Sequence, residues 1–174
     1  MKIGIALGSN LGDRMSNLGA ARKAIIDLVG NRGILASPVY ETEPVGCEPG
    51  AAKFLNAVLE IEYDGDPTEL LEHMIQIEES LGRKRDHSRP PSQAGGASNV
   101  SRKIDIDLLY ADDLTVENEQ LQLPHPRMHL RKFVLQPLAD IHPDLILSGQ
   151  TKTIRELLAE LKDSATVVRF AENW

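Results

Sequence analysis

Strand-like and helix-like patterns follow one another along this chain in the order β-α-β-β-α-β. Alternating apolar residues predict the strands, and apolar residues spaced three or four apart predict the helices. This order is typical of a ferredoxin-like α+β sandwich, in which an antiparallel sheet carries its helices on one face. The opposite face would then be open for a functional site. The predicted strands cover residues 2–8, 34–42, 54–63 and 103–110, and the predicted helices cover residues 18–28 and 66–82.

The first predicted helix follows a turn that contains two glycines. Gly8 and Gly12 mark this turn in the segment GSNLGDR, and Gly30 with Gly33 ends the helix. No Gly-Lys-Ser or Gly-Lys-Thr follows the first glycines, so the pattern of a Walker phosphate loop is absent. We therefore interpret the turn as structural. The apolar face of the helix would consist of Leu18, Ala21, Ile25 and Leu28.

The second predicted helix has the clearest boundaries. Asp66 is a good N-cap, Pro67 stands at the first helical position, and Glu69 would complete a capping box. Its apolar stripe contains a carboxylate, Glu78, which is costly to bury without a partner. We therefore expect Glu78 to face cations, either the arginines that follow it or a metal site. The expected stripe consists of Leu71, Met74, Glu78 and Leu81, and the helix closes at Gly82.

The chain continues beyond the sixth element. A short hairpin is predicted within residues 111–123, a helix begins near Leu130, and a last helix covers about 153–161. These elements would be C-terminal additions to the sandwich. A chain of 174 residues, 41% of them hydrophobic, can bury one core, and it shows neither an internal repeat nor a linker. Residues 1–174 are therefore expected to form a single domain.

Two aspartates lie inside the last of the six elements, in the segment KIDIDLLY. Side chains alternate along a strand, so Asp105 and Asp107 share one face, opposite Ile104, Ile106 and Leu108. Like charges at that distance raise one another's pKa unless a cation lies between them. A solvated strand face is one interpretation, and a site for a divalent metal ion is the other.

The strand FLNAVLEIEY has a similar division. Phe54 and Asn56 share the face opposite the apolar residues of the strand. In a ferredoxin-like sandwich this pair and the two aspartates could all look out from the uncovered face of the sheet. Function is therefore expected on that face. The apolar residues of the strand are Leu55, Ala57, Leu59 and Ile61.

A cationic segment precedes the two aspartates. Residues 83–103 contain six cations and a single acid, Asp86. Residues 86–101 are rich in Pro, Gly, Ser and Ala and lack the periodicity of a helix or strand, which predicts a long loop. Such a loop is either a solvated linker or a lid over the site. The six cations are Arg83, Lys84, Arg85, Arg89, Arg102 and Lys103.

Composition excludes several classes of partner. The formal net charge of -7 argues against general binding of nucleic acid, which requires a basic surface. A single cysteine, Cys47, fits a reducing compartment. The apolar run over residues 3–7 is too short for a signal peptide or a membrane span. We expect a cytoplasmic protein that binds no membrane.

Five blocks stand out along this sequence: ALGSNLGDR at 6–14, FLNAV at 54–58, IEESLGR at 77–83, RKIDIDLLY at 102–110 and LPHPRMHLRKFVLQPL at 123–138. Together these blocks resemble the hydroxymethyldihydropterin pyrophosphokinase family of folate biosynthesis. The resemblance runs over almost the whole chain and implies an ATP-dependent diphosphotransferase. Such an enzyme transfers the intact pyrophosphoryl group from MgATP to the hydroxymethyl group of a reduced pterin and releases AMP.

The same resemblance implies roles for individual residues. The catalytic positions are Arg83, Arg102, Asp105 and Asp107, and the two aspartates match the ligands of Mg²⁺, of which two ions are expected with ATP. The ATP-binding positions are Glu78, Arg83, Arg85, Arg102, Ile106, His125 and Arg131. The pterin-binding positions are Thr42, Pro44, Val45, Phe54, Asn56 and Phe133, where rings would stack on the flat substrate and amides would read its edge.

One departure from the family pattern concerns the expected lid. The family usually carries Trp-Gly-Pro just before the arginine that precedes the two aspartates, whereas this chain has NVS at 99–101 and a longer loop. Other residues of the 86–101 loop would then have to close the site. The roles of His87 and Arg89 in that loop are left open.

Two alternative functions come from other classes. One is a metal-dependent phosphohydrolase that uses the same aspartates. The other is a noncatalytic ferredoxin-like RNA-binding module, which the acidic charge disfavours. The resemblance implies that the partners are ATP and hydroxymethyldihydropterin, and we expect a monomer.

Overall fold

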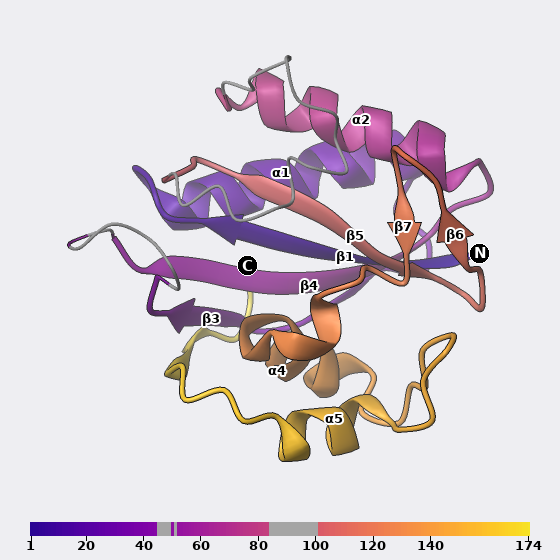
Figure 1. Ribbon diagram of the computed structural model, residues 1–174. Coiled ribbons are helices and arrows are strands. Elements are labelled where there is room, and N and C mark those ends of the chain that lie inside the picture. The colour runs from indigo at the N-terminus through magenta and orange to yellow at the C-terminus, as the bar shows by residue number, and fades with distance from the viewer. Residues whose placement is uncertain (45–49, 51, 84–100) are drawn as a thin grey trace.

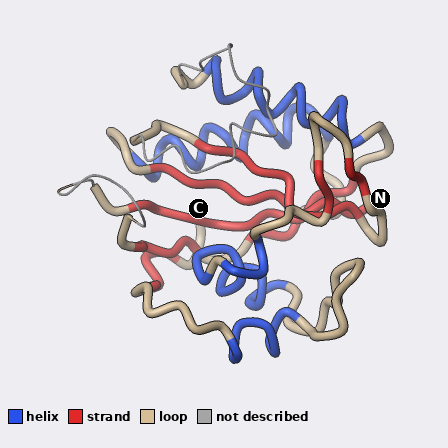
Figure 2. The backbone as a smooth tube through the Cα atoms, in the orientation of Figure 1, coloured by secondary structure: helices blue, strands red, loops and turns tan. Residues whose placement is uncertain are grey.

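The computed structural model describes residues 1–44, 50, 52–83 and 101–174. Its main feature is an antiparallel sheet of six described strands (Figures 1 and 2). Along the sheet the order is β5-β1-β4-β3-β8, and the short β2 pairs with β4. The strands are β1 (Lys2–Ser9), β2 (Leu35–Ala36), β3 (Val39–Thr42), β4 (Phe54–Glu62), β5 (Asp105–Ala111) and β8 (Val167–Ala171).

The predicted order of elements is confirmed. Helices α1 (Arg14–Val29) and α2 (Pro67–Ser80) connect the strands of the β-α-β-β-α-β unit and cover one face of the sheet (Figure 1). Between this layer and the sheet lies an apolar core. It includes Ile3, Ile5 and Leu7 of β1 and Leu55, Ala57, Leu59 and Ile61 of β4, as the alternation predicts. The ferredoxin-like α+β class is therefore confirmed.

The expectation that the opposite face is uncovered is wrong. Helices α4 (Lys132–Ile141) and α5 (Ile154–Glu160) lie on that side, below the sheet in Figure 1. Val58 of β4 and Leu109 of β5 point to this face and pack in a second apolar core with Leu135 of α4. These apolar side chains are costly to leave in water, so the C-terminal helices cover them and leave only part of the face for a site.

Several boundaries differ from the predictions. The strand expected over 34–42 is broken into β2 and β3 because Pro38 has no N–H to donate, while Ser37 bonds to Val58 with both its backbone and its hydroxyl group. Leu28 of α1 is 40% exposed instead of buried, and α2 buries Leu70 in place of Leu71. Strand β8 was not predicted.

Other local predictions agree with the structure. The Asp66 side chain accepts a hydrogen bond from the Thr68 N–H at 2.6 Å and caps α2. The capping box predicted with Glu69 is not among the described hydrogen bonds of α2. Strands β6 (Val116–Glu117) and β7 (Gln122–Leu123) form the expected hairpin, and a short 3₁₀ helix, η1 (Met128–Leu130), precedes α4.

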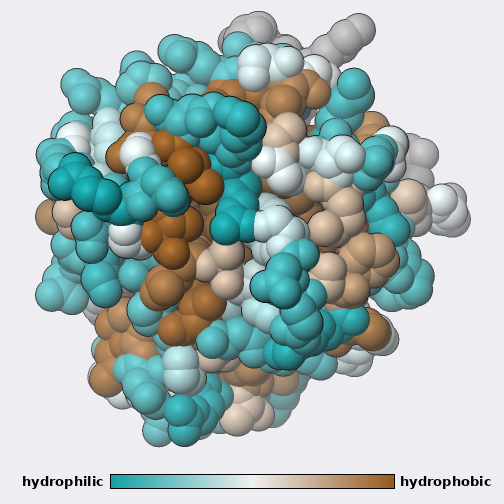
Figure 3. Space-filling view, turned by 180° about the vertical axis from the view of Figure 1, so that it is seen from behind, coloured by the Kyte–Doolittle hydropathy of each residue, from teal (hydrophilic) through white to brown (hydrophobic). Residues whose placement is uncertain are grey.

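The surface mixes apolar and polar side chains. Seen from behind, it shows a band of apolar side chains bordered by hydrophilic ones (Figure 3). Within the described part of the chain, no helix is both long enough and apolar enough to cross a membrane.

Candidate active site

A pocket lies on the α4 side of the sheet, where β1, β4 and β5 meet the chain that leads into α4. It brings together six residues to which the family resemblance assigns roles: Asn56, Asp105, Asp107, His125, Arg131 and Phe133. The predicted gathering of the aspartates with an amide and an aromatic ring is therefore observed. The other lining residues are Ala6, Leu7, Gly8, Ala57, Leu109, Met128 and Val134.

Small residues of β1 make room for this pocket. On the strand face opposite its core residues, β1 carries Gly4, which gives room to the Tyr110 ring, and Ala6 and Gly8, which line the pocket. Gly8 is paired in register with both Asn56 and Asp105, and a Cβ atom added to Gly8 would lie 3.1 Å from Asn56 Oδ1. Interpreting Gly8 as a turn residue was therefore wrong. The strict alternation of small residues on this face was the signal in the sequence.

Two arginines hold Asp105. The Arg83 guanidinium donates to Asp105 Oδ1 at 2.5 Å, and the Arg102 guanidinium donates to Oδ2 at 2.6 Å. Burial alone would raise the pKa of the Asp105 carboxyl, but the charges of Arg102 and Arg83 hold it below its usual range. Asp105 is therefore ionised at neutral pH, with both oxygens engaged by cations.

Asp107 has the opposite environment. Its carboxylate lies 3.9 Å from the Arg131 guanidinium, too far for a strong hydrogen bond. Burial, followed by the negative charge of Asp105, raises the pKa of Asp107 to about 7. The two aspartates share a strand face as predicted, but the arginines compensate only the first of them.

Glu78 supports this arrangement from α2. It is fully buried, pairs with Arg83, and its Oε1 accepts the Ile106 backbone N–H at 2.6 Å. This N–H belongs to an edge strand and would otherwise lack a partner in the sheet. The expectation that Glu78 faces a cation is confirmed. Its contacts also fix Arg83 and the backbone beside Asp105.

The amide of Asn56 is fixed within the sheet. Asn56 Nδ2 donates to Thr42 Oγ1 at 2.7 Å, so Oδ1 is the atom that faces Gly8 at the pocket. Phe133 comes from the first turn of α4, and the Arg131 guanidinium lies 5.5 Å from the centre of its ring. A planar ring and an oriented amide acceptor thus line the same pocket.

His125 reaches the pocket from the loop before η1. Its backbone N–H donates to the Leu109 carbonyl at 2.7 Å, which ties this loop to β5. Burial, with the nearby charges of Arg131 and Arg127, lowers the pKa of His125 to about 4. The imidazole is therefore neutral at physiological pH and can donate a hydrogen bond without carrying charge.

Some of the predicted site residues lie elsewhere or outside the described residues. Phe54 does not line the pocket, although its Cδ1 atom would lie 3.9 Å from a Cβ atom at Gly8. The Ile106 side chain is buried in the core under α1 and α2. Thr42 contacts the pocket through Asn56, and Pro44 is half-buried. Val45, Arg85 and residues 86–100 lie outside the described residues.

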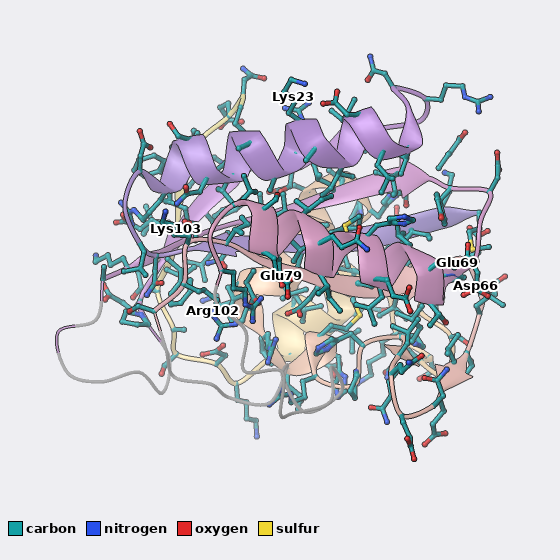
Figure 4. The ribbon with its side chains drawn as sticks, turned by 90° about the horizontal axis from the view of Figure 1, so that it is seen from above. Lys23, Asp66, Glu69, Glu79, Arg102 and Lys103 are labelled. Carbon is teal, nitrogen blue, oxygen red and sulfur yellow. The ribbon has the colours of Figure 1, made fainter. Side chains whose placement is uncertain are left out.

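Sequence reasoning missed Asn10, which fixes the backbone just before β5 begins. Asn10 is 2% exposed. Its Oδ1 accepts the Arg102 N–H at 2.7 Å, and its backbone N–H donates to the Arg102 carbonyl at 3.1 Å. Arg102, the partner of Asn10, lies with Glu79 toward one end of α2, and Asp66 and Glu69 mark the other end (Figure 4). No pattern in the sequence distinguishes Asn10 from an ordinary turn residue.

The donor set fits a metal ion that arrives with a ligand. Among the residues that the structure describes, no group of three or more His, Cys, Asp or Glu is placed to hold a metal ion. Asp105 and Asp107 supply two carboxylates on one strand face. Mg²⁺ is commonly bound through one or two carboxylates together with substrate phosphates and water. The pair suits Mg²⁺ in that mode and lacks the ligands of a structural metal site.

The fold and the pocket define a class of protein, an enzyme that transfers a phosphate-containing group with the help of a metal ion. Carboxylates and guanidinium groups meet beside an aromatic ring and an oriented amide, a combination suited to a polyphosphate and a flat polar acceptor. Comparison with known proteins identifies the family. Residues 4–143 match the model of 7,8-dihydro-6-hydroxymethylpterin-pyrophosphokinase (HPPK), and the chain belongs to this family.

Individual relatives agree with this assignment. A 2-amino-4-hydroxy-6-hydroxymethyldihydropteridine pyrophosphokinase of Methylorubrum extorquens is 39% identical over 160 residues, which cover 92% of this chain and 93% of the relative. The protein of the same name from Bacillus subtilis is 44% identical over 140 residues, or 79% and 75% of the two chains.

Structural similarity supports the fold. The crystal structure of wild-type HPPK-DHPS from Plasmodium falciparum matches 91% of this chain with a TM-score of 0.65 at 14% identity. This chain spans 44% of that longer chain.

Proposed function

We propose that this protein transfers pyrophosphate from MgATP to 6-hydroxymethyl-7,8-dihydropterin, giving the pterin diphosphate and AMP in folate biosynthesis. Family membership supports the reaction. The observation that carries the proposal for this chain is the shared pocket of the aspartate pair with Asn56 and Phe133. It would place the phosphates of one substrate next to the ring of the other.

The aspartates and the arginines would bind different parts of MgATP, the metal ion and the phosphates. Asp105 and Asp107 would hold Mg²⁺, which neutralises charge on the phosphates and keeps them in line for attack. Arg83 and Arg102 already contact Asp105 as cations. When MgATP binds, we infer that these guanidinium groups turn from the carboxylate to phosphate oxygens, which they can bind in a bidentate way.

The acceptor side would hold the pterin. Asn56 Oδ1 would accept a hydrogen bond from the pterin edge, since its Nδ2 is engaged by Thr42. Phe133 would lie against the ring. Neutral His125 would donate to a phosphate oxygen, and Arg131 would supply positive charge beside it.

The group transfer needs no protein nucleophile. The hydroxyl oxygen of the pterin forms a bond to the β-phosphorus, and the bond from that phosphorus to the oxygen retained by AMP breaks. The hydroxyl proton is released. Catalysis then rests on alignment and on stabilisation of charge, to which the oriented groups of the pocket contribute.

Other properties of the protein belong to the same proposal. We propose two Mg²⁺ ions, residues 1–174 as a single pyrophosphokinase domain, a monomeric state and a cytoplasmic location without nucleic-acid partners. Val45 and Arg85 keep their proposed roles in pterin and ATP binding. The two apolar cores on one sheet support the single domain, because neither layer could bury its apolar face without that sheet.

The test is a product assay with MgATP and 6-hydroxymethyl-7,8-dihydropterin. Pyrophosphate transfer predicts equal amounts of AMP and pterin diphosphate. ADP as the product would contradict the reaction type. AMP formed equally well without pterin would indicate the phosphohydrolase alternative instead, and no turnover combined with RNA binding would indicate the RNA-binding module.

A further inference from the structure

The chain beyond the family match contacts the helix that carries two site residues. The match to the family model ends at residue 143, and α5 and β8 follow. Both contact α4, and Figure 1 shows the C-terminal segment running from α5 back to the sheet. On the basis of the proposed site, we propose that the C-terminal segment after α5 positions α4 through Asp163 and Arg169. We call this segment, residues 161–171, the brace.

Helix α4 begins at the pocket and lacks support of its own there. Arg131 stands at its N-cap position and Phe133 in its first turn. The first N–H groups of a helix have no partners within the helix, and acidic side chains near them are stabilising. Arg131 makes no capping hydrogen bond through its side chain, and the first turn contains no acid. The support must come from another segment.

Asp163 provides this support. The Lys132 N–H at the start of α4 donates to Asp163 Oδ2 at 3.4 Å. The other oxygen, Oδ1, accepts the Ala165 N–H at 2.8 Å, which fixes the carboxylate. The Lys132 ammonium group donates to the Ala165 carbonyl at 3.3 Å. A negative charge is thus held at the N-terminus of α4 by the segment between α5 and β8.

Arg169 of β8 supports the C-terminal half of α4. The buried Tyr40 hydroxyl of β3 donates to the Asp140 carboxylate of α4. Arg169 donates to the Tyr40 hydroxyl at 3.1 Å and to Asp140 Oδ1 at 3.3 Å. In the sheet Tyr40 is paired in register with Arg169 on one side and with Asn56 on the other. Arg169 therefore joins α4 to the strand next to the pterin-binding amide.

These contacts set the position of α4 relative to the sheet, and thus the distance between Phe133 and Asn56. Reacting groups are sensitive to such shifts, because a misplacement of 1 Å far from the chemistry can cost about 100-fold in rate. None of the side-chain hydrogen bonds described for Asp163 and Arg169 goes to a residue that lines the pocket. They would act through the placement of α4.

The first test uses Asp163→Ala and Arg169→Ala in the full chain, with Arg155→Ala as the matched control. Arg155 also lies beyond the family match, where it makes an exposed ion pair with Asp144. We expect pterin to bind about 5-fold more weakly to Asp163→Ala, the effect of losing a helix cap, and to Arg169→Ala, the effect of losing a hydrogen bond. The affinity for a nonhydrolysable MgATP analogue is measured beside it, because Arg131 at the start of α4 is proposed to lie near the phosphates. Arg155→Ala should bind both ligands normally.

Conservative variants separate positioning from simple destabilisation. Asp163→Asn keeps an acceptor for the Lys132 N–H, and Arg169→Lys keeps a donor to Tyr40. Partial recovery of pterin affinity is expected in each. No weakening of pterin binding in folded Asp163→Ala and Arg169→Ala protein would overturn the brace.

Hydrogen exchange provides a reading that does not depend on activity. Without ligands, exchange of the amides of Val134 and Leu135, which bond to the Arg131 carbonyl, should speed up about 5-fold in Asp163→Ala and stay unchanged in Arg155→Ala. Unchanged exchange in Asp163→Ala would contradict the role of Asp163. If the wild-type protein fails to form pterin diphosphate, the proposed function fails, while this test of the brace still stands.

Discussion

The two faces of β1 serve different tasks. Toward α1 and α2 the strand presents Ile3, Ile5 and Leu7, which are fully buried or nearly so. Toward α4 it presents only the small residues Gly4, Ala6 and Gly8, two of which line the pocket. One strand therefore fills a core on one side, whereas its small residues on the other side make room for the Tyr110 ring at Gly4 and for the pocket at Ala6 and Gly8. Functional space can be recognised from side-chain size as well as from chemically active groups.

The largest effect is expected on the pocket side, at the carboxylate pair. Asp105→Ala or Asp107→Ala should lower turnover by about 1,000-fold or more, because each would remove a proposed ligand of the metal ion that stabilises the transition state. Asp107→Ala should leave the fold little changed, because it relieves the repulsion between the two aspartates. Asp105→Ala also removes the ion pairs with Arg83 and Arg102 and should lower the stability of the fold. Steady-state rates of AMP formation check this, with exposed Asp113→Ala as the control. Near-normal turnover in either variant at ordinary Mg²⁺ concentration would contradict the assignment.

The next largest effect is expected on the face of β1 toward α1 and α2, and it concerns the free energy of unfolding instead of turnover. Ile5→Ala leaves a cavity under α1 and α2 and should lower the free energy of unfolding by about 3 kcal/mol, roughly 100-fold in the unfolding equilibrium. Pterin affinity of the folded protein should stay near that of the wild type. Urea unfolding and calorimetric titration at low temperature measure the two quantities. A loss of pterin affinity in folded Ile5→Ala would show that the two faces are not separate.

Asn56→Ala tests the pocket without removing a charge. It deletes the acceptor that faces the pocket and leaves Thr42 Oγ1 without its donor. Pterin affinity should fall by about 10-fold to 100-fold, as expected when a buried hydrogen bond is lost, whereas MgATP binding should change little. Titration of each ligand separately distinguishes the two. Equal losses for both ligands would mean that Asn56 holds the sheet together and does not read the pterin.

A smaller effect is expected in the pH dependence of stability that Asp107 causes. Because the folded-state pKa of Asp107 is raised to about 7, its contribution to stability is present at low pH and is lost as pH rises from about 4 through 7. Asp107→Asn removes this dependence. The stability of the variant relative to the wild type should increase as the pH rises from 5 to 8. Urea unfolding at both pH values checks this, and an unchanged difference would contradict the raised pKa.

Much of the fold and of the pocket could be predicted from local patterns. Alternation placed Asp105 and Asp107 on one face, and the cost of burying a carboxylate predicted a cation for Glu78, which pairs with Arg83. These predictions succeed because each depends on a strand period or on the desolvation of one group. They do not depend on where residues that are distant in the sequence lie in the fold.

The features that were missed depend on contacts between distant segments. Strand β8 is five residues long, interrupts its apolar run with Arg169, and pairs with β3 from far along the chain. The cover provided by α4 depends on where the chain returns after β5. Gly8 looks like a turn residue until its register with Asn56 and Asp105 is known. Tertiary placement decided each of these.

The most direct test of the division between the two faces is the pterin dissociation constant of Gly8→Ala. The added Cβ atom would lie 3.1 Å from Asn56 Oδ1, so the amide must shift. Gly19→Ala is the matched control, because a Cβ atom at Gly19 in α1 meets nothing within 4 Å. We predict pterin binding about 5-fold weaker than in the wild type and an unfolding free energy within about 1 kcal/mol of it. Unchanged pterin affinity in Gly8→Ala would contradict the division between the two faces of β1.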